Sequence, residues 1–241
     1  MAHAFAAQLR PHAPVKPATP YRYIEHPFDA KHGIDTGGFI SAKHLVTGHP
    51  HDVYVTGFSA IAPSVFRDLC RRWVATLPDI AGRIEAFSFV DVGAGKGRAV
   101  LLASELPFRK VIGVELSSEL AQSAYQNIER WKTLRRAVTS IRVVHQDITE
   151  FRWPRTPLLV YLFNPFELPL IEELVADLQT AALSGSGPID VAYVNPVYSD
   201  AFRRHFRHLW TARIYMDKTD LAADPYATAS DLVSAFRLTP P

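Results

Sequence analysis

The stretch from Phe87 to Arg98 constrains the fold most, because an apolar run there ends in an acid and three glycines. The run suits a strand buried on both faces, and apolar residues then recur at helical spacing from Ala99 to Leu106. Glycines at 93, 95 and 97 let the backbone turn with positive φ and leave no side chain between the loop and a ligand. The stretch therefore predicts a strand, a tight loop and a helix, an arrangement that cradles nucleotides.

The spacing of the glycines separates the nucleotide classes. The dinucleotide fingerprint requires glycine or alanine at position 98, which is Arg98, and the sequence also lacks the Tyr-x-x-x-Lys pair of short-chain dehydrogenases. The phosphate loop of kinases and GTPases requires Ser or Thr after its lysine, whereas Lys96 is followed by Gly97. The pattern that remains is Asp91-x-Gly93-x-Gly95-x-Gly97.

A second acid follows at the end of the next apolar run, residues 109–115. Glu115 lies about 20 residues beyond the glycine loop, where an acid of a βαβ nucleotide site binds ribose. The two vicinal hydroxyls are donors, and a carboxylate offers two acceptor oxygens. The alternative is an ordinary acid capping the turn before Ser117. Glu115 thus predicts an adenosine ligand without choosing between adenosine cofactors.

Together these motifs resemble those of the class I methyltransferases that use S-adenosylmethionine (SAM), over roughly residues 60–238. The resemblance implies a doubly wound α/β fold with a mostly parallel seven-stranded sheet, helices on both faces and an antiparallel last strand. Phe28-Asp29 and Gly33-Ile-Asp-Thr36 are similar to the leader of bacterial members with unassigned substrates. The cofactor would be SAM, with S-adenosylhomocysteine as product, and its contacts would include Asp91, Gly93, Ala94, Gly95, Gly97, Glu115 and Leu116.

Asp147 follows a third expected strand, residues 140–146. The resemblance implies that Asp147 and Ile148 lie beside the adenine, with the carboxylate accepting a hydrogen bond from the exocyclic amine. The alternative is that Asp147 caps the turn at Ile148-Thr149.

Asn164-Pro165-Phe166 follows the expected strand 157–163, at the edge where open α/β sheets bind ligands. It resembles the Asp/Asn-Pro-Pro-Tyr/Phe motif of amino-group methyltransferases but lacks the second proline. The resemblance implies that Asn164 lies beside the cofactor, that its amide oxygen and the Pro165 carbonyl accept hydrogens from a target nitrogen, and that Phe166 stacks beside it. The reaction would move the sulfonium methyl to an amine of a protein lysine or a small molecule. The alternative for the motif is a plain strand end and helix start. The alternatives for the function are a non-catalytic adenosine-binding protein on the same fold and, after it, an NAD-type dehydrogenase.

Strands and helices alternate from residue 60 to 210, and a final pair of strands closes the chain, which favours a doubly wound sheet. Helices are expected over residues 63–74, 117–131, 168–182 and 202–209, and further strands over 189–194, 212–215 and 232–238.

Three regions are expected along the chain. Residues 1–20 carry four prolines and predict a flexible leader. Residues 21–59 lack clear periodicity and are typical of a lid, from which Asp35, Thr36 and Tyr54 would contact the cofactor. Tyr54 could equally be a core aromatic. Residues 60–241 would form the SAM-binding methyltransferase domain.

Composition narrows the setting. A single cysteine, Cys70, excludes an internal disulfide framework, and the absence of a long apolar run argues against a membrane span, so we expect a cytoplasmic protein. Seven of the ten histidines precede residue 52, including His49 and His51, but no acid or cysteine keeps a recognisable ligand spacing with them, so no metal is expected. The net charge of +2 and the scattered arginine pairs do not indicate nucleic acid, although they do not exclude it. The partner would be a methyl acceptor of unknown class.

Overall fold

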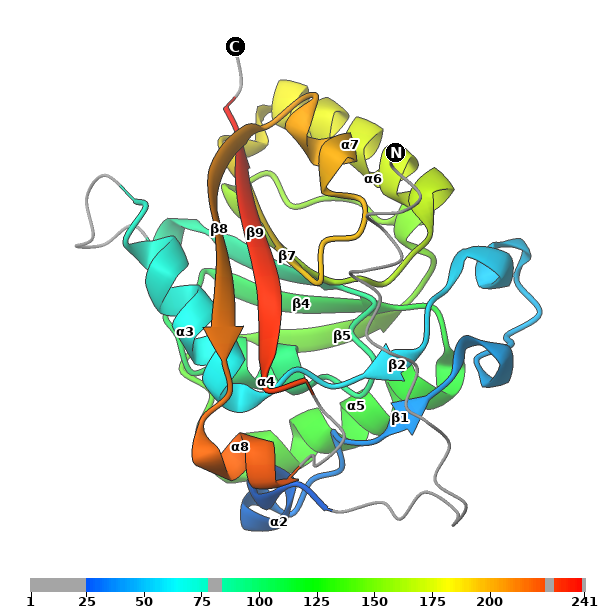
Figure 1. The fold of residues 1–241 in the computed structure, drawn as a ribbon, viewed down its shortest axis with the longest axis vertical. Helices are drawn as coiled ribbons and strands as arrows, with labels where there is room; N and C mark the ends of the chain where they lie inside the picture. Colours follow the sequence, from blue (N-terminus) through cyan, green and yellow to red (C-terminus); the bar gives the residue numbers. More distant parts are fainter. Residues whose placement is uncertain (1–24, 78–83, 224–227, 240–241) are drawn as a thin grey trace.

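The computed structural model describes residues 25–77, 84–223 and 228–239, and a seven-stranded sheet lies at its centre (Figure 1). The strand order is β5-β4-β3-β6-β7-β9-β8. The strands are β3 (Ser88–Val92), β4 (Lys110–Glu115), β5 (Ile141–His145), β6 (Leu158–Phe163), β7 (Ile189–Val194), β8 (Arg207–Tyr215) and β9 (Ser230–Leu238).

Five neighbouring strands, β5 to β7 in this order, are parallel, whereas β9 runs antiparallel to both β7 and β8. Asp91 of β3 pairs with Gly113 of β4 and Tyr161 of β6, so the carboxyl ends of these strands meet at one edge. All five residues of β3 are buried, as expected for a strand covered on both faces. The mostly parallel sheet with an antiparallel last strand confirms the fold class expected from the sequence.

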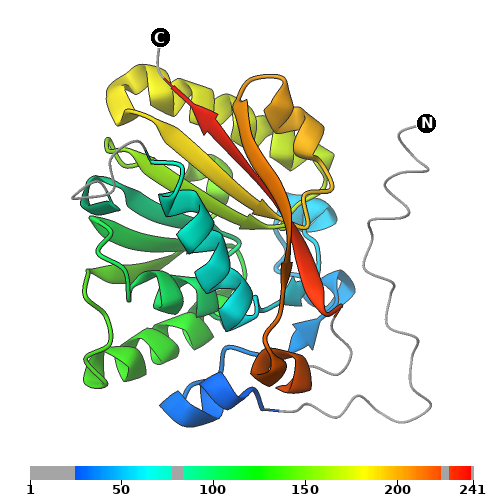
Figure 2. The ribbon, with the colours of Figure 1, turned by 60° about the vertical axis from the view of Figure 1, so that its left-hand side comes forward.

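Helices cover both faces of the sheet (Figure 2). One apolar cluster joins the sheet to α3 (Pro63–Val74), α4 (Arg98–Ala103) and α5 (Ser118–Thr133), and a second joins the other face to α6 (Leu168–Ala181) and α7 (Ser199–Arg203). The short elements between them are η3 (Ile84–Ala86), η4 (Ile148–Glu150), η5 (Ala182–Ser186) and α8 (Lys218–Ala223).

Local signals explain where the helices begin. Pro63 occupies the first turn of α3, where its missing N–H costs no hydrogen bond. Ser117 caps α5, and its hydroxyl accepts a hydrogen bond from the Leu120 N–H at 3.4 Å. These signals are local in sequence, so α3 and α5 start where the sequence predicts.

The expected helix over residues 202–209 is wrong in its extent. α7 ends at Arg203, and Leu209 belongs to β8, which begins at Arg207 rather than at the expected 212. Phe202 and Phe206 do share one packing surface, which explains their helical spacing. Pairing with the long strand β9 determines the conformation beyond them, because it supplies the backbone hydrogen bonds.

The N-terminal part carries α2 (Pro27–His32) and then a segment of short elements. We call residues 39–59 the wall segment; it contains β1 (Phe39–Ile40), η1 (Ala42–His44), η2 (Pro50–Tyr54) and β2 (Phe58–Ser59). β1 and β2 pair with each other, apart from the main sheet. The leader expected over residues 1–20, and residues 21–24 of the expected lid, lie outside the described residues.

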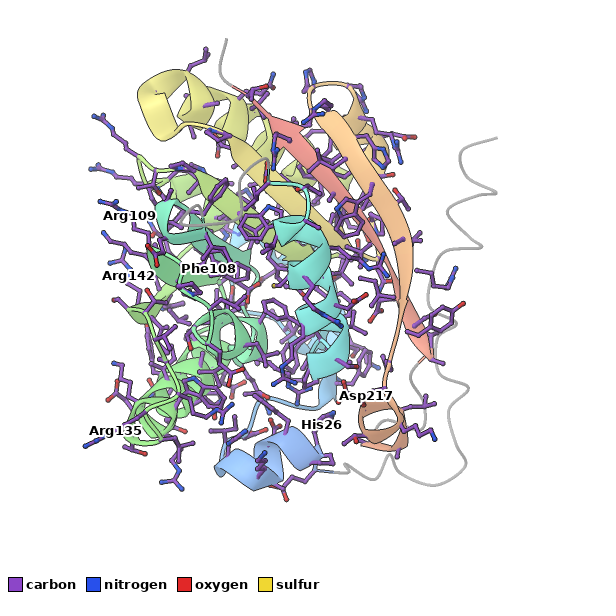
Figure 3. All side chains as sticks on the ribbon, turned by 90° about the vertical axis from the view of Figure 1, so that its left-hand side faces the viewer. His26, Phe108, Arg109, Arg135, Arg142 and Asp217 are labelled. Carbon is purple, nitrogen blue, oxygen red and sulfur yellow. The ribbon has the colours of Figure 1, made fainter. Side chains whose placement is uncertain are left out.

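The adjacent arginines of the sequence, Arg71-Arg72, Arg135-Arg136 and Arg203-Arg204, are mostly exposed. Arg71 and Arg72 both form ion pairs with Asp68 on the surface of α3. Arg135 points away from the fold just after α5, as do Arg109 before β4 and Arg142 in the edge strand β5 (Figure 3). These side chains are scattered over the surface rather than gathered beside the carboxyl edge of the sheet.

Candidate cofactor-binding site

A cleft opens at the carboxyl ends of β3, β4, β5 and β6, between the sheet and the wall segment. The space between its atoms is about 700 Å³, but the volume that water could occupy is only about 80 Å³. Pockets for small ligands usually hold roughly 300–1,000 Å³, so the side chains must shift to admit a nucleoside-sized molecule. Its lining comprises Leu45, His51, Val55, Thr56, Gly57, Phe58, Ser59, Gly93, Gly95, Val114, Glu115, Leu116, Leu120, Gln146, Asp147, Ile148, Phe163, Pro165, Phe166 and Leu170.

The glycine loop forms the floor of this cleft, and two of its glycines are required by close contacts. A Cβ atom at position 95 would lie 2.4 Å from Cε2 of Phe58, and one at position 93 would lie 2.9 Å from Cβ of Pro165. Both glycines also have positive φ, 74° at Gly93 and 54° at Gly95, which L side chains rarely adopt. The loop therefore presents bare backbone to the cleft, as a nucleotide cradle requires.

Glu115 connects the glycine loop to the next strand. Its carboxylate accepts hydrogen bonds from the Gly95 N–H at 2.7 Å and from the Ser117 N–H at 2.8 Å, one on each oxygen. Burial raises its pKa, although these backbone donors act in the opposite direction. A carboxylate has about four acceptor positions, more than these backbone donors use, so a turn-capping role and ribose binding are compatible in the same side chain.

Asp91 lies at the end of β3 and is almost fully buried, without lining the cleft. Burial, and then the nearby negative charge of Glu115, raise its pKa well above the ordinary value. Ala94 and Gly97 also lie outside the lining, where Ala94 donates its N–H to the Val114 carbonyl at 3.0 Å. Asp91, Ala94 and Gly97 therefore support the loop on the side away from the cleft. Leu116 and Ile148 line the cleft directly.

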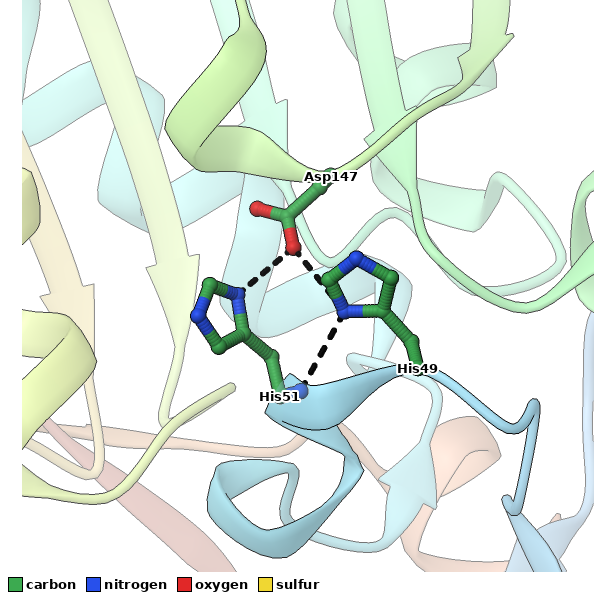
Figure 4. A group of neighbouring side chains, drawn as sticks. All are labelled: His49, His51 and Asp147. Carbon is green, nitrogen blue, oxygen red and sulfur yellow. Dashed lines mark hydrogen bonds and ion pairs between the residues drawn. The ribbon is translucent and has the colours of Figure 1, made fainter.

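Asp147 lines the far end of the cleft, beyond Glu115. Its Oδ1 accepts hydrogen bonds from the backbone N–H and the hydroxyl of Thr149, at 2.7 and 2.8 Å, so the turn-capping alternative is realised. Its Oδ2 lies 2.7 Å from Nδ1 of His51 in the wall segment (Figure 4). Burial alone would raise the pKa of Asp147, but the hydrogen bonds from Thr149 and His51 outweigh it and lower the pKa.

The loop after β6 is paired with the wall segment. Val55 forms an antiparallel bridge with Phe166, and the Thr56 N–H donates to the Pro165 carbonyl at 3.0 Å. The Thr56 hydroxyl donates to the Asn164 carbonyl at 2.5 Å. Pro165 and Phe166 line the cleft as expected, and the Pro165 carbonyl expected to face a substrate already accepts one hydrogen bond.

Asn164 is held in an unusual conformation at the start of this loop. Its φ of 43° lies in the left-handed region, where asparagine is tolerated better than most residues. Its amide oxygen accepts a hydrogen bond from the Tyr193 hydroxyl at 3.2 Å, and its side chain lies outside the lining of the cleft. The structure thus brings Asn164 next to the cleft rather than into it.

The three contacts expected from the N-terminal part are placed elsewhere. Thr36 is fully buried; its hydroxyl donates to Asp29 at 2.5 Å and accepts from Arg98 at 2.6 Å, so it ties α2 to α4 instead of lining the cleft. Asp35 forms an ion pair with Lys96 at 2.9 Å. Tyr54 packs against the apolar cluster beneath α6, which agrees with the alternative that it is a core aromatic.

Sequence reasoning missed the wall residues that enter the cleft, above all Thr56, Phe58 and His51. Their contacts are with residues far along the chain, and the segment has no periodicity that would place them. The only local signal was the Gly57-Phe58 pair, because glycine allows close backbone approach and the aromatic side chain then covers the loop.

No helix among residues 25–77, 84–223 and 228–239 combines the length and apolar character needed to span a membrane.

No family model matches this sequence, and no curated protein does so either. Similar solved structures include a variant of MtNAS in complex with S-adenosylmethionine, at 16% identity and a TM-score of 0.46; the match covers 73% of this chain and 62% of that one. An RNA methyltransferase from Salinibacter ruber in complex with S-adenosyl-L-homocysteine matches at 17% identity and a TM-score of 0.43, covering 76% and 94%. Magnesium protoporphyrin IX methyltransferase from Synechocystis with bound SAM matches at 12% identity and a TM-score of 0.47. This match covers 72% of this chain and 79% of that one.

Proposed function

We propose that the protein is a SAM-dependent methyltransferase whose cofactor binds in the cleft between the glycine loop and the wall segment. The observation that supports this most directly is the convergence of Gly95, Glu115 and Asp147 on one cleft, from the ends of three adjacent strands. The order glycine loop, ribose acid and adenine acid follows the strand order β3, β4, β5. An extended adenosine cofactor lying across these strand ends would contact the glycine loop, the ribose acid and the adenine acid in that order.

The residues present suit this cofactor. Glu115 keeps acceptor capacity for the ribose hydroxyls, and Asp147 Oδ2, which already contacts His51, has a second lone pair for the adenine amine. Leu116 and Ile148 supply apolar walls between these two acids. Arg98 stands where a dinucleotide fold needs its third small residue, and its buried guanidinium pairs with Asp29 at 3.1 Å, which disfavours NAD.

When bound, the cofactor supplies a methyl group activated by the sulfonium. The task left to the protein is to align the acceptor atom with that methyl and to exclude water. Phe58 and the Pro165-Phe166 pair would form the walls around the reacting atoms, since they flank the glycine loop. The wall segment is fixed to Pro165 and Phe166 by backbone pairing, so both walls would move together when the cofactor enters.

We further propose an amine nitrogen, in a protein lysine or a small molecule, as the acceptor. An amine can lose its proton before transfer, so it needs no dedicated base, and Asn164 offers an amide oxygen at the edge of the cleft that could orient it. The bond from Tyr193 uses one lone pair of that oxygen and leaves the other available.

The test has two stages. Calorimetry should show binding of SAM and S-adenosylhomocysteine and no binding of NAD. Tritiated methyl-SAM should then label one fraction of a lysate, and the chemistry of that fraction (protein, nucleic acid or small molecules) identifies the acceptor. NAD binding without SAM binding would refute the cofactor assignment. SAM binding without label in any fraction would favour a non-catalytic adenosine-binding protein.

A further inference from the structure

Two histidines of the wall segment meet Asp147 at the far end of the cleft. The Oδ2 atom of Asp147 lies 2.7 Å from Nδ1 of His51 and 3.3 Å from Nδ1 of His49 (Figure 4). The Asp147 side chain is 5% exposed, His51 is 25% exposed and His49 is 36% exposed, so the group is accessible from solvent on the histidine side. One ligand atom from each of the three residues lies within 4.8 Å of the others.

The hydrogens of this group cannot give an attractive contact between every pair of the three ligand atoms, His49 Nδ1, His51 Nδ1 and Asp147 Oδ2. An ionised carboxylate cannot donate, so His51 Nδ1 supplies the hydrogen of its 2.7 Å contact. His49 Nδ1 accepts from the His51 backbone N–H at 3.2 Å, which requires a lone pair on that nitrogen. His49 Nδ1 and Asp147 Oδ2 are then two acceptors facing each other at 3.3 Å. A shared cation would make this contact attractive, and it would take the single lone pair of His49 Nδ1 from the His51 N–H.

The spacing suits a small divalent ion. Zinc binds imidazole nitrogen and carboxylate oxygen at about 2.0–2.2 Å, which puts tetrahedral ligand atoms about 3.4 Å apart. The separation of His49 from Asp147 already has this size, and that of His51 from Asp147 would widen when the hydrogen between them is displaced. Two imidazoles with one carboxylate favour zinc and its neighbours over magnesium or calcium, which prefer oxygen ligands alone.

The surrounding structure holds the ligands in place. Thr149 fixes Asp147 through two hydrogen bonds to Oδ1, which leaves Oδ2 directed at the histidines. In the wall segment the Asp52 carboxylate accepts from Thr47 and Gly48 at 2.7 to 2.8 Å and so orders the turn that carries both histidines. Support of this kind around the ligands is typical of metal sites.

We propose that His49, His51 and Asp147 bind one divalent transition-metal ion of the zinc class. Three protein ligands leave a fourth position for water. The ion joins the wall segment to the turn after β5, 96 residues away in sequence, and stabilises that contact by mass action. The site shares Asp147 with the proposed adenine contact, but it does not depend on that contact, because the three ligand side chains already lie together in the structure.

The experiment uses untagged, cofactor-free full-length protein. Calorimetry with zinc should give one saturable site per chain, and cobalt should give the visible absorption of a tetrahedral or five-coordinate ion. His49→Asn keeps an acceptor for the cap of η2 but removes the imidazole, and His51→Ala removes the second ligand. Each variant should weaken zinc binding by about tenfold or more. His44→Asn is the matched control, since His44 is exposed in the same segment and contacts Ser41 instead; its zinc affinity should equal that of the wild type.

Absence of saturable zinc binding to the wild type would overturn the proposal. So would zinc binding that is unchanged in both folded variants, or that His44→Asn weakens as much as they do. Binding of S-adenosylhomocysteine is measured on the same samples, so a failure of the metal site leaves the cofactor proposal separately tested.

Discussion

The aromatic ring of Phe58 rests on the backbone of Gly95, so closely that a Cβ atom at position 95 would lie 2.4 Å from Cε2 of the ring. This contact joins the wall segment to the glycine loop. The ring also lines the cleft, beside Gly93 and Pro165. A molecule that binds against the backbone of Gly95 on this side would therefore displace the ring.

Gly95→Ala should destabilise the protein by two separable effects. The positive φ of 54° costs about 1–2 kcal/mol in a residue with a side chain, and the new methyl collides with Phe58. Gly48→Ala isolates the first effect, because Gly48 has φ of 86° with nothing within 4 Å of its Cβ position. Urea unfolding should show a larger loss for Gly95→Ala, and adding Phe58→Ala should abolish the excess. Equal losses at positions 48 and 95 would show that the ring yields at no cost.

Glu115→Ala should weaken binding of S-adenosylhomocysteine by about 1.5–3 kcal/mol, the range for hydrogen bonds to a charged group, which is roughly 10- to 150-fold in Kd. The control is Glu119→Ala, an exposed acid in the first turn of α5, which should bind as the wild type does. Calorimetry gives the affinities and circular dichroism confirms folding. Because Glu115 also orders Gly95 and Ser117, a variant that unfolds would indicate that its structural bonds dominate.

Asp91→Asn should raise the free energy of unfolding at pH 7. Burial raises the pKa of Asp91 in the folded state, so an ordinary unfolded carboxyl loses its proton first and favours unfolding as the pH rises. Asparagine has the same shape and cannot ionise, so it removes this cost. The gain should shrink as the pH falls towards the ordinary pKa of an aspartate, where both states are protonated. A variant less stable than the wild type at pH 7 would show that the ionised carboxylate is satisfied in the fold.

Asn164→Ala should lower kcat for the identified acceptor by roughly 100-fold, the size seen when one positioned hydrogen-bonding group is removed, while SAM affinity changes little. Asn195→Ala is the comparison, because Asn195 also has positive φ, 49°, but donates to Asp231 rather than bordering the cleft. Normal turnover in Asn164→Ala together with lost turnover in Asn195→Ala would move the acceptor to the end of β7.

Asp190→Ala should cost about 3–5 kcal/mol of stability, since it leaves the Arg237 guanidinium without its buried partner. Asp190 accepts two bonds from Arg237 at 2.6 Å and one from the Trp73 indole at 2.7 Å, and it is fully buried. Asp200→Ala, which breaks an exposed pair with Arg203 at 3.8 Å, should leave the urea midpoint unchanged. Similar midpoints for both variants would contradict this difference.

The core of the fold was predictable because its signals are local. The strand before Gly93, the acid at Glu115 and the cap at Ser117 each depend on residues within one turn or strand, and the structure has all three. The boundary between α7 and β8 was not predictable. The spacing of Phe202 and Phe206 suits a helix, and only the pairing with β9 makes the residues from Arg207 onward a strand.

The wall segment could not be predicted, because its contacts are with residues far away in the sequence. Val55 meets Phe166, and His51 meets Asp147, through contacts that no spacing of neighbouring residues encodes. The expectation of no metal considered only ligands close in sequence, whereas the fold brings an acid to His49 and His51 from a distant turn. The sequence suggests that Thr36 contacts the cofactor. In the structure its hydroxyl instead accepts a hydrogen bond from Arg98, the residue that breaks the dinucleotide pattern.

The buried bond between Arg98 and Asp29 spans 69 residues, and the contact of Asp35 with Asn127 spans 92. Closing loops of this length is entropically costly, and the partners exist only once the strands around the glycine loop have assembled. During synthesis the N-terminal segment leaves the ribosome first, but it has nothing to bind until much of the sheet has followed. We therefore expect its amide protons to gain protection last in a refolding pulse-labelling experiment, after those of β3 and β4.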